Sequence, residues 1–261
     1  MPTPEMRVAR EAAAAAGDVL MRYFRDGFAI RTKSANNLVT DADIEAEQTV
    51  AQAIRAAFPD HALLGEEGLA GDVSAEHLWV IDPLDGTNNF AHRIPHFAVS
   101  IAYYHRGQPM CGAIYNPARG DWFTAARGHG AWAGDRPARV GAEKALNESL
   151  VACGFYYDRG AMMESTLSAI RDAFAANVHG VRRMGTASLD LAQVGCGLFG
   201  AYFEYLLSPW DFAAGRLFVE EAGGRVTTAR GEDVPIASCS IMASNGLLHD
   251  EMLAITARHH L

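Results

Sequence analysis

The stretch Trp79-Val80-Ile81-Asp82-Pro83-Leu84-Asp85-Gly86-Thr87-Asn88-Asn89-Phe90 joins a short apolar run to two carboxylates and a Gly-Thr turn. The run predicts a buried strand that delivers Asp82 and Asp85 to one end of a sheet. Carboxylate oxygens suit Mg²⁺ or Mn²⁺, and such ions bind phosphate oxygens in turn. Pro83 stiffens the turn, and Gly86 lets backbone amides approach an anion closely. The stretch therefore predicts a metal site beside a phosphate cradle, with an ordinary turn at a strand end as the structural alternative.

Three further segments combine acidic, small and apolar residues in a similar way. Upstream, Leu38-Val39-Thr40-Asp41-Ala42-Asp43 opens a helical pattern, and Gly65-Glu66-Glu67-Gly68 follows the apolar pair Leu63-Leu64. Far downstream lies Trp210-Asp211-Phe212-Ala213-Ala214-Gly215. A single short motif often misleads, whereas several in order along one chain carry far more weight.

Together the four segments resemble the inositol monophosphatase family of Mg²⁺-dependent, lithium-sensitive phosphatases. The family pattern is an acidic Gly-Glu-Glu turn, then Asp-Pro-Ile/Leu-Asp-Gly-Thr-x-Asn-Phe, then Trp-Asp-x-Ala-Ala-Gly, and the likeness runs through nearly the whole chain. The resemblance implies an α+β fold, the layered αβαβα sandwich of the sugar-phosphatase type. It also implies an active site between two halves of the chain.

The resemblance further implies a set of metal ligands made of oxygen atoms. Glu66, Asp82 and the backbone carbonyl of Leu84 would hold one Mg²⁺, and Asp82, Asp85 and Asp211 would hold a second. A third, weaker position and Mn²⁺ as an alternative ion are also expected. The residue pattern agrees independently, because Glu66, Asp82 and Asp85 all follow or end predicted strands and Asp211 opens a predicted helix.

Family members activate a water on the first ion, and the matching residues here are Glu66 and Thr87. Metal coordination lowers the pKa of water towards neutrality, so no histidine base is needed and no phosphoenzyme forms. Asp43 matches an acid that hydrogen-bonds the threonine, which gives it a supporting catalytic role. The backbone N–H groups of Gly86 and Thr87, at the start of a short helical segment, are expected to hold the phosphate.

The expected substrate contacts come from both halves of the chain. Glu204 lies seven positions before Asp211, the family spacing of a glutamate that contacts sugar hydroxyls. Gly185-Thr186-Ala187 matches a backbone segment that lines the same pocket. An exposed edge-strand charge is the alternative for Glu204. The full expected substrate-binding set is Asp85, Gly86, Thr87, Ala187, Glu204 and Asp211.

These expectations point to Mg²⁺-dependent hydrolysis of a small polyol or sugar phosphate, with inositol 1-phosphate first. Histidinol phosphate is the runner-up, followed by fructose 1,6-bisphosphate and 3′-phosphoadenosine phosphates, because metal chemistry alone does not separate them. A protein that binds a phosphometabolite or regulates a partner is the non-enzyme alternative, since some bacterial relatives are thought to contact transcription machinery. The intact acid set favours the enzyme.

Composition and charge restrict the function classes. With 49% hydrophobic and 20% charged residues, the 261-residue chain has the composition of a globular protein and is long enough for a large core. A net charge of −9 disfavours binding to nucleic acid or to an anionic membrane. A phosphate substrate would therefore need bound cations as its local positive charge. A homodimer is the family default.

Four widely spaced cysteines and the absence of a signal-like start indicate a reduced, cytoplasmic protein. Cys111, Cys153, Cys196 and Cys239 form no Cys-x-x-Cys pair and are expected to be buried. No apolar stretch approaches the roughly 20 residues that span a bilayer.

Hydrophobic periodicity divides the chain into two halves that form one functional unit. Residues 1–145 form an N-terminal α+β half with the main metal motifs, and residues 146–261 form a C-terminal α/β half with Glu204 and Asp211. The first half is predicted to hold helices over 5–24 and 41–58 and a mainly antiparallel sheet. The second is predicted to hold strands at 150–153, 201–206, 225–228 and 241–243 and helices at 162–175, 186–194, 209–222 and from about 247.

Several nearby polar residues receive weaker interpretations. His92 and His96 follow the main motif, but an all-oxygen ligand set favours surface or hydrogen-bonded positions for them. The arginine pair Arg182-Arg183 is expected in an interface or a salt bridge. Lys33 and Glu67 keep undetermined roles.

Overall fold

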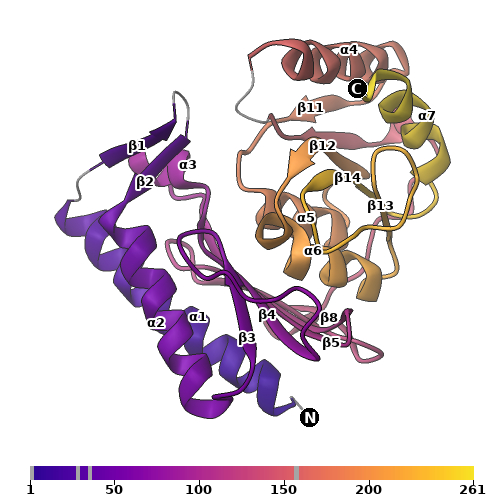
Figure 1. Ribbon diagram of the computed structural model, residues 1–261. Coiled ribbons are helices and arrows are strands. Elements are labelled where there is room, and N and C mark those ends of the chain that lie inside the picture. Colours follow the sequence, from indigo (N-terminus) through magenta and orange to yellow (C-terminus); the bar gives the residue numbers. More distant parts are fainter. Residues whose placement is uncertain (1–2, 28–29, 35–36, 156–158) are drawn as a thin grey trace.

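The first two long helices begin at side chains that the sequence offers as caps. The computed structural model describes residues 3–27, 30–34, 37–155 and 159–261 (Figure 1). Helix α1 (Pro4–Asp26) starts after Thr3, whose Oγ1 accepts the N–H of Met6 at 3.2 Å. Helix α2 (Asp41–Ala57) starts with a capping box in which the N–H of Thr40 donates to Asp43 Oδ2 at 2.8 Å. The capping aspartate of α2 is thus one of the predicted catalytic residues.

A seven-stranded sheet forms the core of the first half. Its order is β3-β4-β5-β6-β7-β8-β9, with β3 and β4 parallel and all other neighbours antiparallel. The predicted antiparallel character is confirmed. The strands are β3 (Ala62–Gly65), β4 (His77–Asp85), β5 (Ala98–His105), β6 (Gln108–Asn116), β7 (Asp121–Ala126), β8 (Gly130–Ala133) and β9 (Arg136–Pro137).

A five-stranded mixed sheet forms the core of the second half, in the order β11-β10-β12-β14-β13. Its strands are β10 (Leu150–Cys153), β11 (Gly180–Arg182), β12 (Ala201–Leu207), β13 (Arg225–Thr227) and β14 (Cys239–Ser244). The helices of this half are α4 (Ala161–Ala175), α5 (Ala187–Gly195), α6 (Pro209–Glu221) and α7 (His249–His259).

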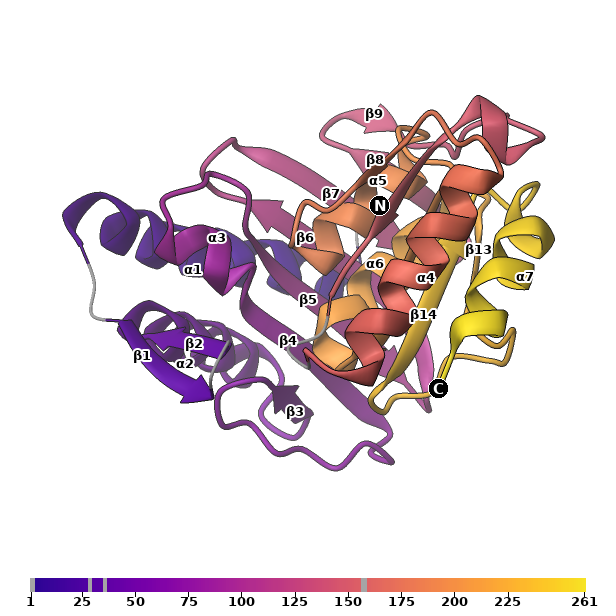
Figure 2. The ribbon, with the colours of Figure 1, turned by 90° about the horizontal axis from the view of Figure 1, so that it is seen from above.

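The helices and the two sheets stack in five layers, which confirms the predicted αβαβα sandwich. Helices α1 and α2 contact one face of the large sheet, α5 and α6 contact both sheets, and α4 and α7 cover the outer face of the small sheet. Figure 1 shows this order from lower left to upper right, and Figure 2 shows α4 and α7 side by side. The central layer, α5 and α6, therefore comes from the C-terminal half and joins the two sheets.

Helix α6 belongs to the C-terminal half by sequence but packs into the large sheet of the N-terminal half. Its apolar side chains Leu217 and Phe218 share one core cluster with Val80, Ile114 and Phe123. Gly112 on β6 permits the close approach, because a Cβ atom there would lie 3.0 Å from the Cα of Ala214. A buried aromatic or leucine side chain contributes about 1.5–3 kcal/mol, so this contact is a major link between the halves.

Hydrophobic periodicity did not predict the shortest elements of the structure. These are the hairpin of β1 (Ile30–Ser34) and β2 (Asn37–Thr40), strands β8, β9 and β11, and the one-turn 3₁₀ helix Leu146–Glu148. The short helix α3 (Thr87–Ala91) begins where the Gly-Thr turn was expected to become helical. The side chain of Lys33, in β1, lies outside the described part of the structure. Among the described helices, none combines the length and apolar character needed to cross a bilayer.

Candidate active site

The end of β4 brings three predicted acids towards one another. Strand β3 runs parallel to β4 with Gly65 paired to Ile81, so Glu66 leaves β3 next to Asp82. The pairing of β4 with β5 shifts between Asp82 and Asp85, where Pro83 interrupts the ladder. Residues along a regular strand alternate between faces, so this irregularity changes where the second carboxylate points. Both aspartates are buried.

The turn after β4 is held by side-chain hydrogen bonds. The N–H of Leu84 donates to Asp82 Oδ1 at 3.0 Å. The hydroxyl of Thr87 lies 3.1 Å from the Leu84 carbonyl oxygen and 3.2 Å from Asp43 Oδ1. The predicted link between Asp43 and Thr87 is therefore present, and it orients a hydroxyl beside the predicted metal-ligand carbonyl.

Gly86 has a backbone conformation and surroundings that exclude a side chain. Its φ is 95°, and a Cβ atom there would lie 2.4 Å from Thr186 Oγ1. An L-residue in this region costs roughly 1–2 kcal/mol even without the clash. The short helix after Gly86 also contacts the C-terminal half. Asn89 Nδ2 donates to the carbonyl oxygen of His96 at 2.8 Å and to that of Met184, in the C-terminal half, at 2.9 Å.

Asp85 is bonded to the helix that carries the predicted Ala187 contact. The backbone N–H groups of Ala187 and Ser188 donate to its two carboxylate oxygens at 3.3 and 2.7 Å. These amides belong to the first turn of α5, where N–H groups have no partner within the helix. The N–H of Ala187 is thus engaged by Asp85 in this structure.

Asp211 stands at the start of α6, where it closes a second capping box. Its Oδ2 accepts the N–H of Ser208 at 2.6 Å, and Pro209 occupies the first turn. Asp211 lines the same cavity as the β4 acids. The acids therefore reach one place from a strand of the large sheet and from a helix of the central layer.

Glu204 is buried on β12, so it is not an exposed edge charge. Its Oε2 accepts a hydrogen bond from the Tyr202 hydroxyl at 2.7 Å. Gly154 makes room for the carboxylate, because a Cβ there would lie 1.7 Å from Oε2. Burial raises the pKa of Glu204 to about 7. Tyr202 is a partner that the sequence reading missed.

One cavity of about 180 Å³ contains these groups. Every predicted site residue except Asp43 lines it, and Asp43 reaches it through Thr87. Its lining includes Glu66, Asp82, Leu84, Asp85, Gly86, Thr87, Arg183, Ala187, Asp190, Glu204 and Asp211.

Mutual repulsion and burial dominate the electrostatics of the cavity. Burial raises the pKa of Asp82 well above its usual value, and Glu66, Asp85 and Asp211 add to the effect. Asp211 shows the same upward shift in pKa, first from burial and then from Asp85 and Glu66. Burial also raises the pKa of Asp85 to about 6, against the lowering effect of the Ser188 and Ala187 bonds. Such buried like charges coexist as anions only if cations lie among them.

The donor set therefore fits hard divalent cations. The carboxylate residues Glu66, Asp82, Asp85 and Asp211 line the cavity together with Leu84, and oxygen ligands are what Mg²⁺ and Mn²⁺ prefer. Within the described residues, Arg183 is the single cationic side chain that lines the cavity.

Three residues, two of them lining the cavity, have positions or contacts that the motifs did not predict. Asp190 on α5 is 1% exposed, and its Oδ1 has no hydrogen-bond partner among the described residues. Burial, then Asp85 and Glu204, raises the pKa of Asp190 well above its usual value. Arg183, expected in an interface or salt bridge, lines the cavity instead. Glu47 on α2 accepts the N–H of Glu67 at 2.8 Å and so positions the acidic turn.

None of these residues belongs to a recognised motif, but the sequence around Asp190 does indicate a buried polar residue. An aspartate three residues after Ala187, inside an otherwise apolar helical run, points to a polar role in a buried element. Glu47 carried no comparable signal, because its place on the inner side of α2 depends on tertiary packing.

The predictions for the histidines and cysteines are confirmed only in part. His92 is exposed as expected, but His96 has a buried Nε2 without a hydrogen-bond partner among the described residues, so that expectation was wrong. All four cysteines are free, yet only Cys111 and Cys153 are fully buried. Cys196 and Cys239 lie in partly exposed positions.

Comparison with known proteins supports the interpretation of the cavity. A model of the inositol monophosphatase family matches residues 1–261. The chain is 41% identical over 259 residues to a putative Nus factor SuhB of Neisseria meningitidis serogroup B, covering 98% of this chain and 99% of the relative. It is 41% identical over 249 residues to an inositol-1-monophosphatase of Caulobacter vibrioides, covering 93% and 97%. The solved structure of extragenic suppressor protein suhB from Bartonella henselae matches with a TM-score of 0.91 and 37% identity, covering 97% and 98%.

The layered fold, the carboxylate-lined cavity and these relatives together define the class of the protein, which is a phosphoric monoester hydrolase. Within that class, the chain belongs to the inositol monophosphatase family. The likeness covers the whole chain and includes both halves of the cavity.

Proposed function

We propose that this hydrolase cleaves the phosphate monoester of a small polyol, with inositol 1-phosphate as its preferred substrate and Mg²⁺ as its cofactor. The observation that carries the proposal is the convergence of Glu66, Asp82, Asp85 and Asp211 on one cavity that is also lined by the buried Glu204. The four acids can bind cations, which in turn bind a phosphate. Glu204 can accept hydrogen bonds from the hydroxyl groups of the alcohol.

Two or three Mg²⁺ ions, held by Glu66, Asp82, the Leu84 carbonyl, Asp85 and Asp211, would neutralise phosphate charge and lower the pKa of water. Asp43 keeps the Thr87 hydroxyl in place through the 3.2 Å contact, and Glu66 and Thr87 orient the attacking water. The N–H groups of Gly86 and Thr87 hold phosphate oxygens. The ester is hydrolysed directly, without a phosphoenzyme.

Glu204 would recognise the alcohol through hydrogen bonds from its hydroxyl groups. The Tyr202 bond at 2.7 Å fixes one carboxylate oxygen of Glu204, which lines the cavity. Hydrogen bonds that involve a charged group contribute about 1.5–3 kcal/mol, which is enough to rank substrates. The Caulobacter vibrioides relative, named as an inositol-1-monophosphatase, supports this choice.

Histidinol phosphate remains the alternative substrate, because Glu204 and Asp190 would also suit an ammonium group. A substrate panel separates the two. With saturating Mg²⁺, kcat/KM for inositol 1-phosphate should exceed that for histidinol phosphate, glycerol 2-phosphate and fructose 1,6-bisphosphate. A higher value for histidinol phosphate would reject inositol 1-phosphate as the preferred substrate.

A partner-regulating role is a second candidate, because the Neisseria relative is named a putative Nus factor. The two roles are compatible, and activity assays on the purified chain test only the enzymatic one. We further propose a cytoplasmic homodimer that lithium inhibits. Light scattering after gel filtration tests the dimer, and a lithium titration of turnover tests the inhibition.

The two halves, 1–145 and 146–261, are proposed to act as one functional unit. Helix α6 supports this proposal, since it carries Asp211 and packs into the large sheet. Neither half expressed alone should bind the substrate. Mixing the halves tests whether their association restores turnover.

A further inference from the structure

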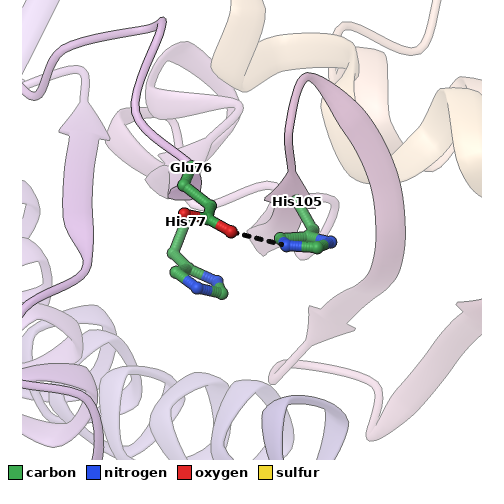
Figure 3. Close-up of side chains that lie close together, drawn as sticks. All are labelled: Glu76, His77 and His105. Carbon is green, nitrogen blue, oxygen red and sulfur yellow. Dashed lines mark hydrogen bonds and ion pairs between the residues drawn. The ribbon is translucent and has the colours of Figure 1, made fainter.

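A cluster of two histidines and one glutamate lies at the opposite end of β4 from the acids. His77 is the first residue of β4 and His105 the last residue of β5, and the two are paired directly across the strands (Figure 3). Glu76 immediately precedes His77. At about 3.3 Å per residue, five residues of strand place His77 roughly 16 Å from Asp82. The cluster is therefore separate from the active-site cavity.

The ligand atoms are close enough for one ion to draw them together. One atom from each of Glu76, His77 and His105 lies within 4.8 Å of the others. Glu76 Oε1 and His105 Nε2 are 3.4 Å apart. Zinc bonds of about 2.0–2.1 Å in a tetrahedral site put ligand atoms roughly 3.4 Å apart, so only modest contraction is needed.

His77 is already oriented by its neighbours. Its Nδ1 lies 2.6 Å from the hydroxyl of the buried Tyr103, which leaves Nε2 as the outward nitrogen. Its ring stacks on His61 with centroids 4.4 Å apart, and His61 Nδ1 accepts the Trp79 indole N–H at 3.0 Å. A hydrogen bond to the second ring nitrogen fixes ring orientation in metal-ligating histidines in the same way.

The other two ligands have room to adjust. The rings of His77 and His105 are 5.0 Å apart and inclined by 22°, so the His105 ring must turn for both nitrogens to face one ion. The His105 side chain is 37% exposed, which permits this rotation. Glu76 Oε1 accepts bonds from Arg106 at 2.8 and 3.1 Å, while Oε2 has no partner among the described residues. An exposed ion pair of this kind contributes little and does not hold the carboxylate firmly.

We propose that Glu76, His77 and His105 form a surface site for a borderline divalent transition metal, with Zn²⁺ as the main ion and Co²⁺ or Ni²⁺ as substitutes. Imidazole nitrogens favour these ions, whereas Mg²⁺ prefers oxygen ligands and several waters. Two nitrogens and one carboxylate leave at least one coordination position for water or an outside ligand. Protons compete for imidazole nitrogen, so binding weakens in acid.

The test is Co²⁺ and Zn²⁺ titration of the whole chain in saturating Mg²⁺, which fills the oxygen-rich cavity. Calorimetry should show one Zn²⁺ equivalent, and Co²⁺ should give visible absorption bands of a nitrogen-containing site. Glu76→Gln and His105→Gln should each weaken Zn²⁺ binding at least about 10-fold. Removing a group that only supports a ligand already lowers metal affinity by about that factor, and removing the ligand itself should lower it more. Both variants should keep wild-type phosphatase activity.

His129→Gln is the matched control, because His129 is exposed on a turn outside the cluster. Its Zn²⁺ affinity should equal that of the wild type. Unchanged binding in both Glu76→Gln and His105→Gln would overturn the proposal, as would an equal loss in His129→Gln. Circular dichroism of each variant shows whether the fold is kept, and large destabilisation is unexpected because Glu76 and His129 are exposed and His105 is partly exposed. Zn²⁺ should also raise the Tm of the wild type but not that of His105→Gln.

Discussion

Asp85 Oδ2 accepts the backbone N–H of Ser188 at 2.7 Å, and this bond joins the last residue of β4 to the first turn of α5. A proposed metal ligand from the N-terminal half is thus held by backbone from the C-terminal half. Loss of contact between the halves would therefore release Asp85 as well as move Asp211. The cavity depends on tertiary packing more than on either strand alone.

Asp82→Asn should abolish turnover and keep the fold. The substitution removes one negative charge from the centre of the acid group while it preserves size. Loss of even an outer-shell partner costs about 10- to 100-fold in metal affinity or activity, so loss of a proposed ligand should exceed about 100-fold. Steady-state kinetics over a range of Mg²⁺ concentrations measures this effect. Asp121→Asn, in an exposed ion pair with Arg119, is the control, and retained activity in Asp82→Asn would contradict the proposed site.

Without divalent cations, the protein should lose stability as pH rises from about 4.5 to 7.5. Burial raises the pKa of Asp43 to about 6, of Asp85 to about 6 and of Glu204 to about 7. The folded state therefore binds more protons than the unfolded state above the ordinary carboxyl pKa of about 4, and its stability falls as pH approaches those values. Thermal melts after chelation measure this slope.

Mg²⁺ should reverse that loss, and more strongly at pH 7.5 than at pH 5.5. Deprotonated carboxylates bind the ion, whereas protonated ones do not. Sodium chloride at matched ionic strength is the control for screening. Equal Tm shifts from both salts would show that the acids do not form a specific cation site.

Asp190→Asn and Glu204→Gln should change substrate choice more than phosphate hydrolysis itself. Each carboxylate lines the cavity without being a proposed metal ligand, and a lost hydrogen bond to a charged group corresponds to roughly 10- to 150-fold in KM. Phenyl phosphate, whose leaving group offers no hydroxyl donor, should be hydrolysed at nearly wild-type kcat/KM. An equal loss of kcat/KM for phenyl phosphate and for inositol 1-phosphate would indicate that these carboxylates have a structural role and do not recognise the alcohol.

Gly112→Val should lower both stability and activity although it lies outside the cavity. The first side-chain atom would be 3.0 Å from the Cα of Ala214 on α6, and overpacking typically costs 1–3 kcal/mol. Because α6 carries Asp211, its displacement should raise the Mg²⁺ concentration needed for half-maximal turnover. Ala113→Val, the adjacent buried position on β6, separates general core damage from displacement of α6.

The motifs predicted the acids, the turn and their common location, because these features depend on local chemistry. The buried run before Asp82 and the caps at Asp43 and Asp211 are visible in the sequence as such. Asp190 and Glu47 were missed because their positions depend on which faces of α5 and α2 turn inward. Arg183 was missed because its place beside the cavity depends on how the segment between β11 and α5 packs. The hairpin of β1 and β2 was missed because its short strands show little hydrophobic periodicity.

The approach of β6 to α6 at Gly112 has a consequence for how this enzyme tolerates change. One absent methyl group sets the spacing between a sheet and the helix that presents a distant carboxylate. A larger side chain at Gly112 would thus weaken cation affinity although it changes no atom that a ligand contacts. A search for substitutions that abolish catalysis should therefore include the contact between β6 and α6 as well as the residues that line the cavity.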